Sequence, residues 1–190
     1  MKEPKGSLPK PLKLGDIAPN FEGLKGVDGK VYSLSSFDDK PILVFVFMAN
    51  RCPTASRYTE RLKSIQDDYA SKGVQLIGID SDDPYLFSSE TLDEMVKVAK
   101  FRELNFPYLK DEDQRVGMAY GAWVTLHIFV FDRNRKLRYR GRVDDSRDPS
   151  LVTRRDLRDA LDDLLFGKEV RNPDTKPFAC FIEYTRIVER

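Results

Sequence analysis

Residues 41–69, PILVFVFMANRCPTASRYTERLKSIQDDY, contain the pattern that decides the fold. The stretch opens with eight consecutive apolar residues, 42–49, which are too few to cross a membrane and are typical of a strand buried on both faces. It continues with apolar residues spaced three and four apart, which places them on one face of a helix: Ala55, Tyr58, Leu62, Ile65 and Tyr69. The stretch therefore predicts a strand, a tight turn and a long helix.

Cys52 lies in the predicted turn, followed by Pro53, so its thiol stands at the amino end of the helix. Unpaired backbone N–H groups and the helix dipole favour an anion there. Making a thiol of pKa ~8.5 mostly ionised at neutral pH takes a shift of about 2 units, or roughly 2.7 kcal/mol. Because the helix end supplies only about 0.3–1 kcal/mol, a nearby cation must help. Arg51 and Arg57 are the candidates in the local sequence.

An inert cysteine is the alternative interpretation of the same turn. Cys52 precedes Ala55 by three residues and so extends the apolar face of the helix. Free cysteine is among the most buried residue types. Position and local charge favour a reactive thiol but leave this alternative open.

The composition describes a soluble globular protein of one domain. The chain has 190 residues, 41% hydrophobic and 33% charged, with a net charge of +1. No basic run exceeds two residues, so the sequence favours neither nucleic acid nor a membrane as a partner. Residues 1–13 lack the apolar core of a signal peptide, which predicts a cytoplasmic protein. No metal-ligand cluster or glycine-rich phosphate loop is present, so we expect no metal and no cofactor.

The remaining pattern predicts an α/β fold with a central mixed sheet flanked by helices. The expected elements, in chain order, are a β-hairpin in 21–37, a strand at 74–80, a helix opened by a capping box at 91–94, an extended link at 106–109, a short helix at 114–120, a hairpin of 126–131 and 136–143, and a last helix opened by Thr153. We divide the chain into an N-terminal arm (1–13), one domain (14–167) and a C-terminal tail (168–190) that packs on the same domain. A β-rich run at 178–184 lies inside this tail.

Several short motifs resemble those of one family. The turn NRCP (50–53), the strand end YRG (139–141) followed by DD (144–145), and TKP (175–177) before a last cysteine occur in this order. Together they are similar to small peroxiredoxin-like proteins of the alkyl hydroperoxide reductase/thiol-specific antioxidant family. The likeness covers roughly residues 14–184 and implies a thioredoxin-like fold.

The resemblance also implies a chemistry. Cys52 would reduce a peroxide or a protein disulfide, an external dithiol donor would restore it, and the protein would be an antioxidant redoxin, with a homodimer as a possible assembly. Cys180 would be the resolving thiol, which condenses with the sulfenic acid of Cys52 to form a disulfide. A structural cysteine that packs the tail on the core is the equal alternative for Cys180, since a disulfide needs Cα atoms within ~7 Å.

Three departures from the family patterns bear on activity. Ala49 stands where peroxiredoxins have a Thr or Ser, and Leu126 stands where thioredoxins have a cis-proline and where peroxiredoxins have an arginine facing the thiol. Non-proline cis bonds cost ~2.5–4 kcal/mol, so we expect a trans bond before Leu126. Ala55 replaces the second cysteine of a Cys-x-x-Cys motif, which excludes a dithiol at 52 and 55.

Two further alternatives remain open in the sequence. His127, the only histidine, is either a general base for Cys52 or a partly buried strand residue, and the second interpretation is favoured. The whole chain is either a thiol-dependent oxidoreductase or a catalytically inactive redoxin fold that serves as a binding or scaffold module. Leu126 favours the inactive module, whereas the retained turn around Cys52 favours the enzyme.

Overall fold

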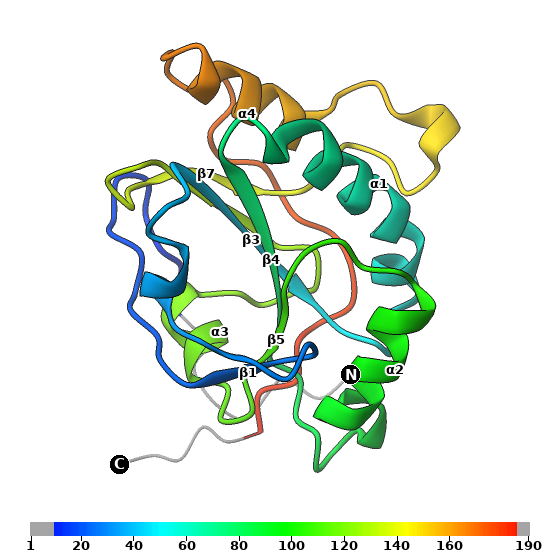
Figure 1. Ribbon diagram of the computed structural model, residues 1–190. Helices are drawn as coiled ribbons and strands as arrows, with labels where there is room; N and C mark the ends of the chain where they lie inside the picture. The colour runs from blue at the N-terminus through cyan, green and yellow to red at the C-terminus, as the bar shows by residue number, and fades with distance from the viewer. Residues whose placement is uncertain (1–9, 186–190) are drawn as a thin grey trace.

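The computed structural model describes residues 10–185, which form one mixed sheet with helices on both faces (Figure 1). The strands are β1 (Leu24–Gly26), β2 (Val31–Tyr32), β3 (Ile42–Met48), β4 (Val74–Asp80), β5 (Tyr108–Lys110), β6 (Ile128–Phe131) and β7 (Leu137–Gly141). The α-helices are α1 (Pro53–Ala70), α2 (Leu92–Phe101), α3 (Arg115–Tyr120) and α4 (Asp156–Leu165). The short 3-10 helices are η1 (Leu34–Phe37), η2 (Ser88–Glu90) and η3 (Pro149–Leu151). The strand order is β2-β1-β5-β4-β3-β6-β7.

The predicted strand–turn–helix stretch is the centre of the fold. β3 pairs in parallel with β4, from Ile42 opposite Val74 to Met48 opposite Asp80, and antiparallel with β6. Every residue of β3 is buried, as the continuous apolar run predicts. Alternate β3 side chains face two cores, one shared with α1, α2 and α4 and the other shared with α3. The strand therefore ends in a fixed position from which the turn at Cys52 projects.

Phe45 packs at the middle of the core on the α3 side of the sheet. Its ring lies 5.2–6.0 Å, centroid to centroid, from the rings of Phe21, Tyr120 and Phe131. We expect Phe45→Ala to lower the free energy of unfolding by about 3–5 kcal/mol, because it removes apolar contacts and leaves a cavity. Phe101→Ala is the matched control, since Phe101 is 88% exposed. Urea unfolding of the two variants checks this; equal losses would contradict it.

One predicted helix start and one predicted capping box are wrong, for local hydrogen-bonding reasons. The last helix begins at Asp156 and not at Thr153, because the Thr153 N–H donates to the Asp145 carboxylate at 2.9 Å and its hydroxyl donates to the same group. α2 does begin after Thr91, but without a capping box: the Thr91 hydroxyl donates to the carbonyl of Ser88 at 3.1 Å. In both cases the threonine hydroxyl donates a hydrogen bond to a group in the preceding segment and does not accept one from the N–H groups at the helix end.

Two predicted strands are shorter or absent. β6 begins at Ile128, because Leu126 has a left-handed backbone with φ of 58°. The run 178–184 forms no strand and makes only an isolated antiparallel bridge between Phe181 and Val124. The tail instead crosses the domain: Asp174 bridges to Arg140 of β7, and the chain then runs beside the loop that precedes β6 (Figure 1).

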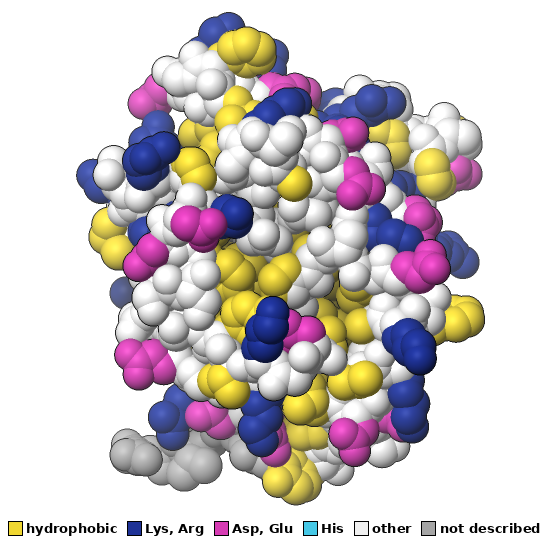
Figure 2. Space-filling view, viewed as in Figure 1, with side chains coloured by type: hydrophobic (Ala, Val, Ile, Leu, Met, Phe, Trp, Pro, Cys, Tyr) yellow, Lys and Arg dark blue, Asp and Glu magenta, His cyan; other side chains and the backbone are white. Residues whose placement is uncertain are grey.

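The surface matches the balanced composition. On the face drawn in Figure 2, positive and negative side chains are interspersed around apolar ones. In residues 10–185 no helix is long and apolar enough to span a bilayer. Most of the N-terminal arm, residues 1–9, lies outside the described residues, and Lys10 and Pro11 approach Gly121 so closely that a Cβ there would lie 2.4 Å from the Pro11 Cα.

Candidate active site

Cys52 is the residue that caps the amino end of α1. It follows β3, has an extended backbone, and its Sγ accepts a hydrogen bond from the Ala55 N–H at 3.4 Å. Pro53 occupies the first helical position, where a missing N–H costs nothing. The residue is 0% exposed. The strand and the helix together therefore hold the thiol where the predicted turn places it.

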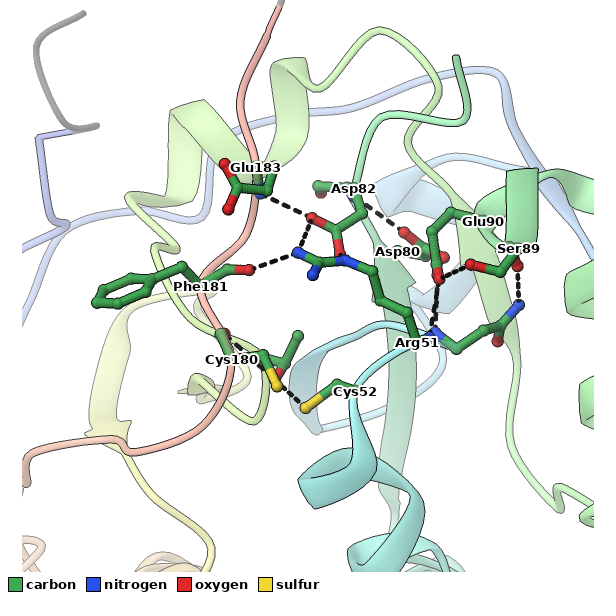
Figure 3. A network of polar contacts seen from close by, with 12 residues as sticks. Arg51, Cys52, Asp80, Asp82, Ser89, Glu90, Cys180, Phe181 and Glu183 are labelled. Carbon is green, nitrogen blue, oxygen red and sulfur yellow. Dashed lines mark hydrogen bonds and ion pairs between the residues drawn. The ribbon is translucent and has the colours of Figure 1, made fainter. Parts of the chain in front are cut away.

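Cys180 comes to this site from the tail. The Thr125 N–H donates to the Cys180 carbonyl at 2.9 Å, which ties the tail to the loop before β6. The two cysteine side chains point toward each other and are hydrogen-bonded, while both remain free thiols (Figure 3). Cys180 is less buried than Cys52. Two residues that are 128 positions apart in the sequence thus form one pair.

The pair is electrostatically asymmetric. Burial by itself raises the pKa of Cys52, but hydrogen bonds from the Cys180 thiol, the Thr125 hydroxyl, and the backbone of Ala55 and Cys180 outweigh it, so the pKa is lowered. Burial and the hydrogen bond to Cys52 raise the pKa of Cys180 to about 11. The arrangement therefore favours a thiolate at Cys52 and a protonated thiol at Cys180.

Thr125 is the contributor to this site that the sequence analysis missed. Its hydroxyl donates to the Cys52 Sγ at 3.0 Å, which supplies from the loop before β6 the hydroxyl that Ala49 lacks. The bond before Leu126 is trans, as predicted, since residues 10–185 contain no cis peptide bond. The Leu126 N–H donates to the Phe47 carbonyl at 2.6 Å and anchors the loop on β3. The position of Thr125, directly before the missing proline, was the signal available.

We expect Thr125→Val to raise the pH midpoint of Cys52 alkylation by about one unit. The change removes a hydrogen bond that stabilises the thiolate, worth about 1.5 kcal/mol, so the pKa of Cys52 rises. The pH dependence of the alkylation rate with a small haloacetamide checks this in the Cys180→Ser background, where only Cys52 reacts. Thr125→Ser keeps the hydroxyl and is the control. Equal midpoints for the Val and Ser variants would contradict the role.

Arg51 and Arg57, the two predicted stabilisers of the thiolate, lie in different places. The Arg51 Nε is 2.8 Å from the Asp82 carboxylate, and its Nη2 donates to the Phe181 carbonyl at 2.9 Å. The charge of Arg51 lowers the pKa of Cys180. It is not among the main causes of the shifted pKa of Cys52. Arg57 is exposed and borders a surface hollow with Arg147, and no hydrogen bond or ion pair within residues 10–185 joins it to Cys52.

A buried carboxylate fixes the turn itself. Glu90 accepts the N–H groups of Asn50 at 2.7 Å and of Arg51 at 2.8 Å (Figure 3). It is 0% exposed and adjoins Asp80, whose pKa is raised by burial and by Glu90, against the opposing effect of Lys110. Unsatisfied N–H groups in a buried turn are costly, so Glu90 holds the backbone that presents Cys52.

His127 is not joined to the thiol by any hydrogen bond in the described chain. It is 3% exposed, the centre of its ring lies 4.3 Å from that of Phe129 with the two planes tilted by 42°, and its Nδ1 has no partner within residues 10–185. Burial lowers the pKa of His127 to about 3; the charge of Arg140 also lowers it, and the charge of Asp174 raises it. These contacts favour the structural interpretation over the general base.

The comparison with protein families decides the identity of this fold and site. The model of the AhpC/TSA family matches residues 14–140. The chain belongs to the AhpC/TSA family. It is 32% identical to peroxiredoxin Bcp of Escherichia coli K12 over 113 residues, which is 60% of this chain and 67% of Bcp. The predicted family and the peroxiredoxin-like character of the chain are confirmed.

Solved structures share this fold. A hypothetical protein from Sinorhizobium meliloti is 37% identical, with a TM-score of 0.86 over 93% of this chain and 97% of that one. A putative thiol:disulfide interchange protein DsbE from Chlorobium tepidum shares the fold at 22% identity, with a TM-score of 0.63 over 82% of this chain and 97% of that one. The thioredoxin-like α/β fold is confirmed. This AhpC/TSA protein is a thiol-dependent oxidoreductase, which disfavours the inactive module.

Proposed function

We propose that Cys52 is the thiol that attacks a hydroperoxide and that Cys180 resolves the product within the same chain. The observation that carries the proposal is the hydrogen-bonded pair of free thiols in which only Cys52 has a lowered pKa. The names of the peroxiredoxin relatives support a peroxide as substrate. An exogenous thiol reductant completes the cycle.

The first step uses the thiolate. Cys52–S⁻ attacks the outer oxygen of ROOH, the O–O bond breaks, and RO⁻ takes up a proton to leave as ROH, so that Cys52 becomes a sulfenic acid. The hydrogen bonds from Thr125 and from the Ala55 N–H stabilise the attacking charge. The bonds formed and broken in this step require neither a metal nor an organic cofactor.

The second step joins the two sulfurs. Cys180–SH attacks the sulfenic sulfur, the S–O bond breaks, and the thiol proton leaves with the hydroxyl as water. A donor dithiol then attacks the disulfide and is itself oxidised, returning two thiols. Attack on the Cys180 sulfur is favoured, because Cys180 is the less buried of the two and Cys52 has the lower pKa and is the better leaving group.

Intact-mass measurement after one equivalent of hydrogen peroxide tests the proposal. The reduced protein is expected to lose two hydrogens as a monomer, and neither Cys52→Ser nor Cys180→Ser shows that loss. Cys180→Ser is expected to gain one oxygen instead, trapped as a dimedone adduct at Cys52. An unchanged mass after prolonged exposure would overturn peroxide reduction. A stable single-oxygen adduct in the unaltered chain would overturn the role of Cys180.

Reduction of a protein disulfide by the same thiol is the second candidate, favoured by the fold shared with the DsbE protein. The test is reduction of an insulin disulfide, and the Cys180→Ser variant would then trap a mixed disulfide at Cys52. The predicted homodimer has its own test in the peroxide experiment, where a covalent dimer would place Cys180 of one chain on Cys52 of another. A cytoplasmic location stays a prediction from the sequence.

A further inference from the structure

We propose that Arg51 and Asp82 form a clasp that docks the tail, so that their function is to position Cys180 on Cys52. The inference rests on the proposed function and adds two positioning residues to it. Neither residue makes a hydrogen bond to the Cys52 sulfur in the described chain. Both contact the tail at residues that follow Cys180 in the sequence (Figure 3).

Arg51 is held on three sides. Its guanidinium pairs with Asp82 through Nε at 2.8 Å and Nη2 at 3.4 Å, and it lies 4.1 Å from the centre of the Phe87 ring. The remaining direction of Nη2 is used to donate to the Phe181 carbonyl at 2.9 Å. A planar guanidinium suits such a site, because its donors are fixed in one fork. Arg51 thus connects the turn before Cys52 to the residue after Cys180.

Asp82 completes the clasp from the end of β4. Its side chain is 0% exposed, and its Oδ1 accepts the Glu183 N–H at 2.7 Å. One carboxylate therefore holds both the arginine that grips Phe181 and the tail backbone two residues further on. Burying this charge is costly unless it is paired and hydrogen-bonded, and the tail supplies one of these hydrogen bonds.

The clasp matters because the tail has no regular structure of its own. Around Cys180 it is held by single hydrogen bonds, such as those from Thr125 N–H to Cys180 and from Ile182 N–H to the Trp123 carbonyl. A segment held this way samples an undocked state that depends on each contact. Loss of the clasp would keep Cys180 away from the sulfenic acid of Cys52 for a larger fraction of the time.

An undocked tail has a chemical consequence. A sulfenic acid that does not meet Cys180 reacts with a second ROOH: the sulfenate sulfur attacks, the O–O bond breaks, and sulfinic acid and ROH form. Disulfide and sulfinic acid are thus alternative products of one intermediate. Their ratio at a fixed peroxide concentration measures Cys180 docking and does not depend on how fast the sulfenic acid forms.

The test is this product ratio in Asp82→Asn, measured by mass spectrometry over a range of peroxide concentrations. We expect the disulfide-to-sulfinic ratio to fall about ten- to a hundredfold, as the loss of a buried charge-assisted contact implies. Arg51→Gln removes the arginine of the clasp, which is the partly exposed member of the pair. It is expected to lower the disulfide-to-sulfinic ratio to a similar extent. The fluorescence of Trp123, the sole tryptophan, reports undocking independently, because its ring lies 5.9 Å from the Phe181 ring.

Asp163→Asn is the matched control. Asp163 accepts the Nε and the backbone N–H of Arg171, a similar donor set on the tail that lies nine residues before Cys180. Equal ratios in Asp82→Asn and the unaltered chain would overturn the clasp, and so would an equal fall in Asp163→Asn. Failure of the unaltered chain to form any disulfide would overturn the proposed function instead. Cooperative urea unfolding of each variant shows that it is folded.

Discussion

Replacing Cys52 by serine is expected to reduce peroxide turnover at pH 7 about a hundredfold or more. The serine hydroxyl cannot form a sulfenic acid, so Cys180 would be the only thiol left. The pKa of Cys180 is raised to about 11 in the paired site, where roughly one molecule in ten thousand is ionised at pH 7. Burial, the largest cause of this raised pKa, persists without Cys52, so Cys180 remains mostly protonated at pH 7 in the variant. The measurement is peroxide consumption with an excess of dithiol.

Cys180→Ser is the comparison that separates the two thiols. It keeps Cys52 and the Thr125 hydroxyl, so the first equivalent of peroxide is still consumed, while later turnovers are slow or end in sulfinic acid. Activity of Cys52→Ser within tenfold of the unaltered chain would show that Cys52 is not the nucleophile. Circular dichroism of both variants excludes misfolding as the cause, since serine is nearly isosteric with cysteine.

Replacing His127 by phenylalanine is expected to remove a large part of the acid sensitivity of the fold. His127 is buried against Phe129 and near Trp123, and burial lowers its pKa to about 3. In the unfolded chain the imidazole has an ordinary pKa of about 6.5. The unfolded state therefore binds a proton first as the pH falls, and stability is lost between pH 6.5 and 3. Above pH 6.5 the imidazole is neutral in both states, so His127 causes no loss of stability there.

The loss of stability that His127 causes at low pH is large enough to measure by urea unfolding. At pH 4.5, two units below the unfolded pKa, His127 costs roughly 2–3 kcal/mol relative to pH 8. Buried carboxyls with raised pKa values, such as Asp80 and Asp111, stabilise the fold as the pH falls. They are present in both the unaltered chain and the His127→Phe variant, so their effect cancels in the comparison. Urea unfolding of both proteins at pH 8 and 4.5 isolates the histidine. An equal pH-dependent loss in the variant would contradict the assignment.

The local elements were predictable because their causes are local. The apolar run of β3 and the three-and-four spacing of α1 specify a buried strand and an amphipathic helix from side-chain periodicity alone. The turn between them carries Cys52 at a helix end for the same reason. The helix start that failed, at Thr153, and the capping box that failed, at Thr91, depended on whether a side chain bonds forward to a helix or back to a loop, and sequence spacing does not distinguish the two.

The sequence by itself determined the fold class, the family and the thiol at the start of α1. Only the tertiary structure decided which groups surround that thiol. Thr125 and Cys180 reach Cys52 from distant segments, and Arg51 turns away from the thiol because Asp82, thirty-one residues later, offers a buried carboxylate. Periodicity reports which face of an element is buried, whereas hydrogen bonds between elements depend on how the sheet brings the ends of its strands together.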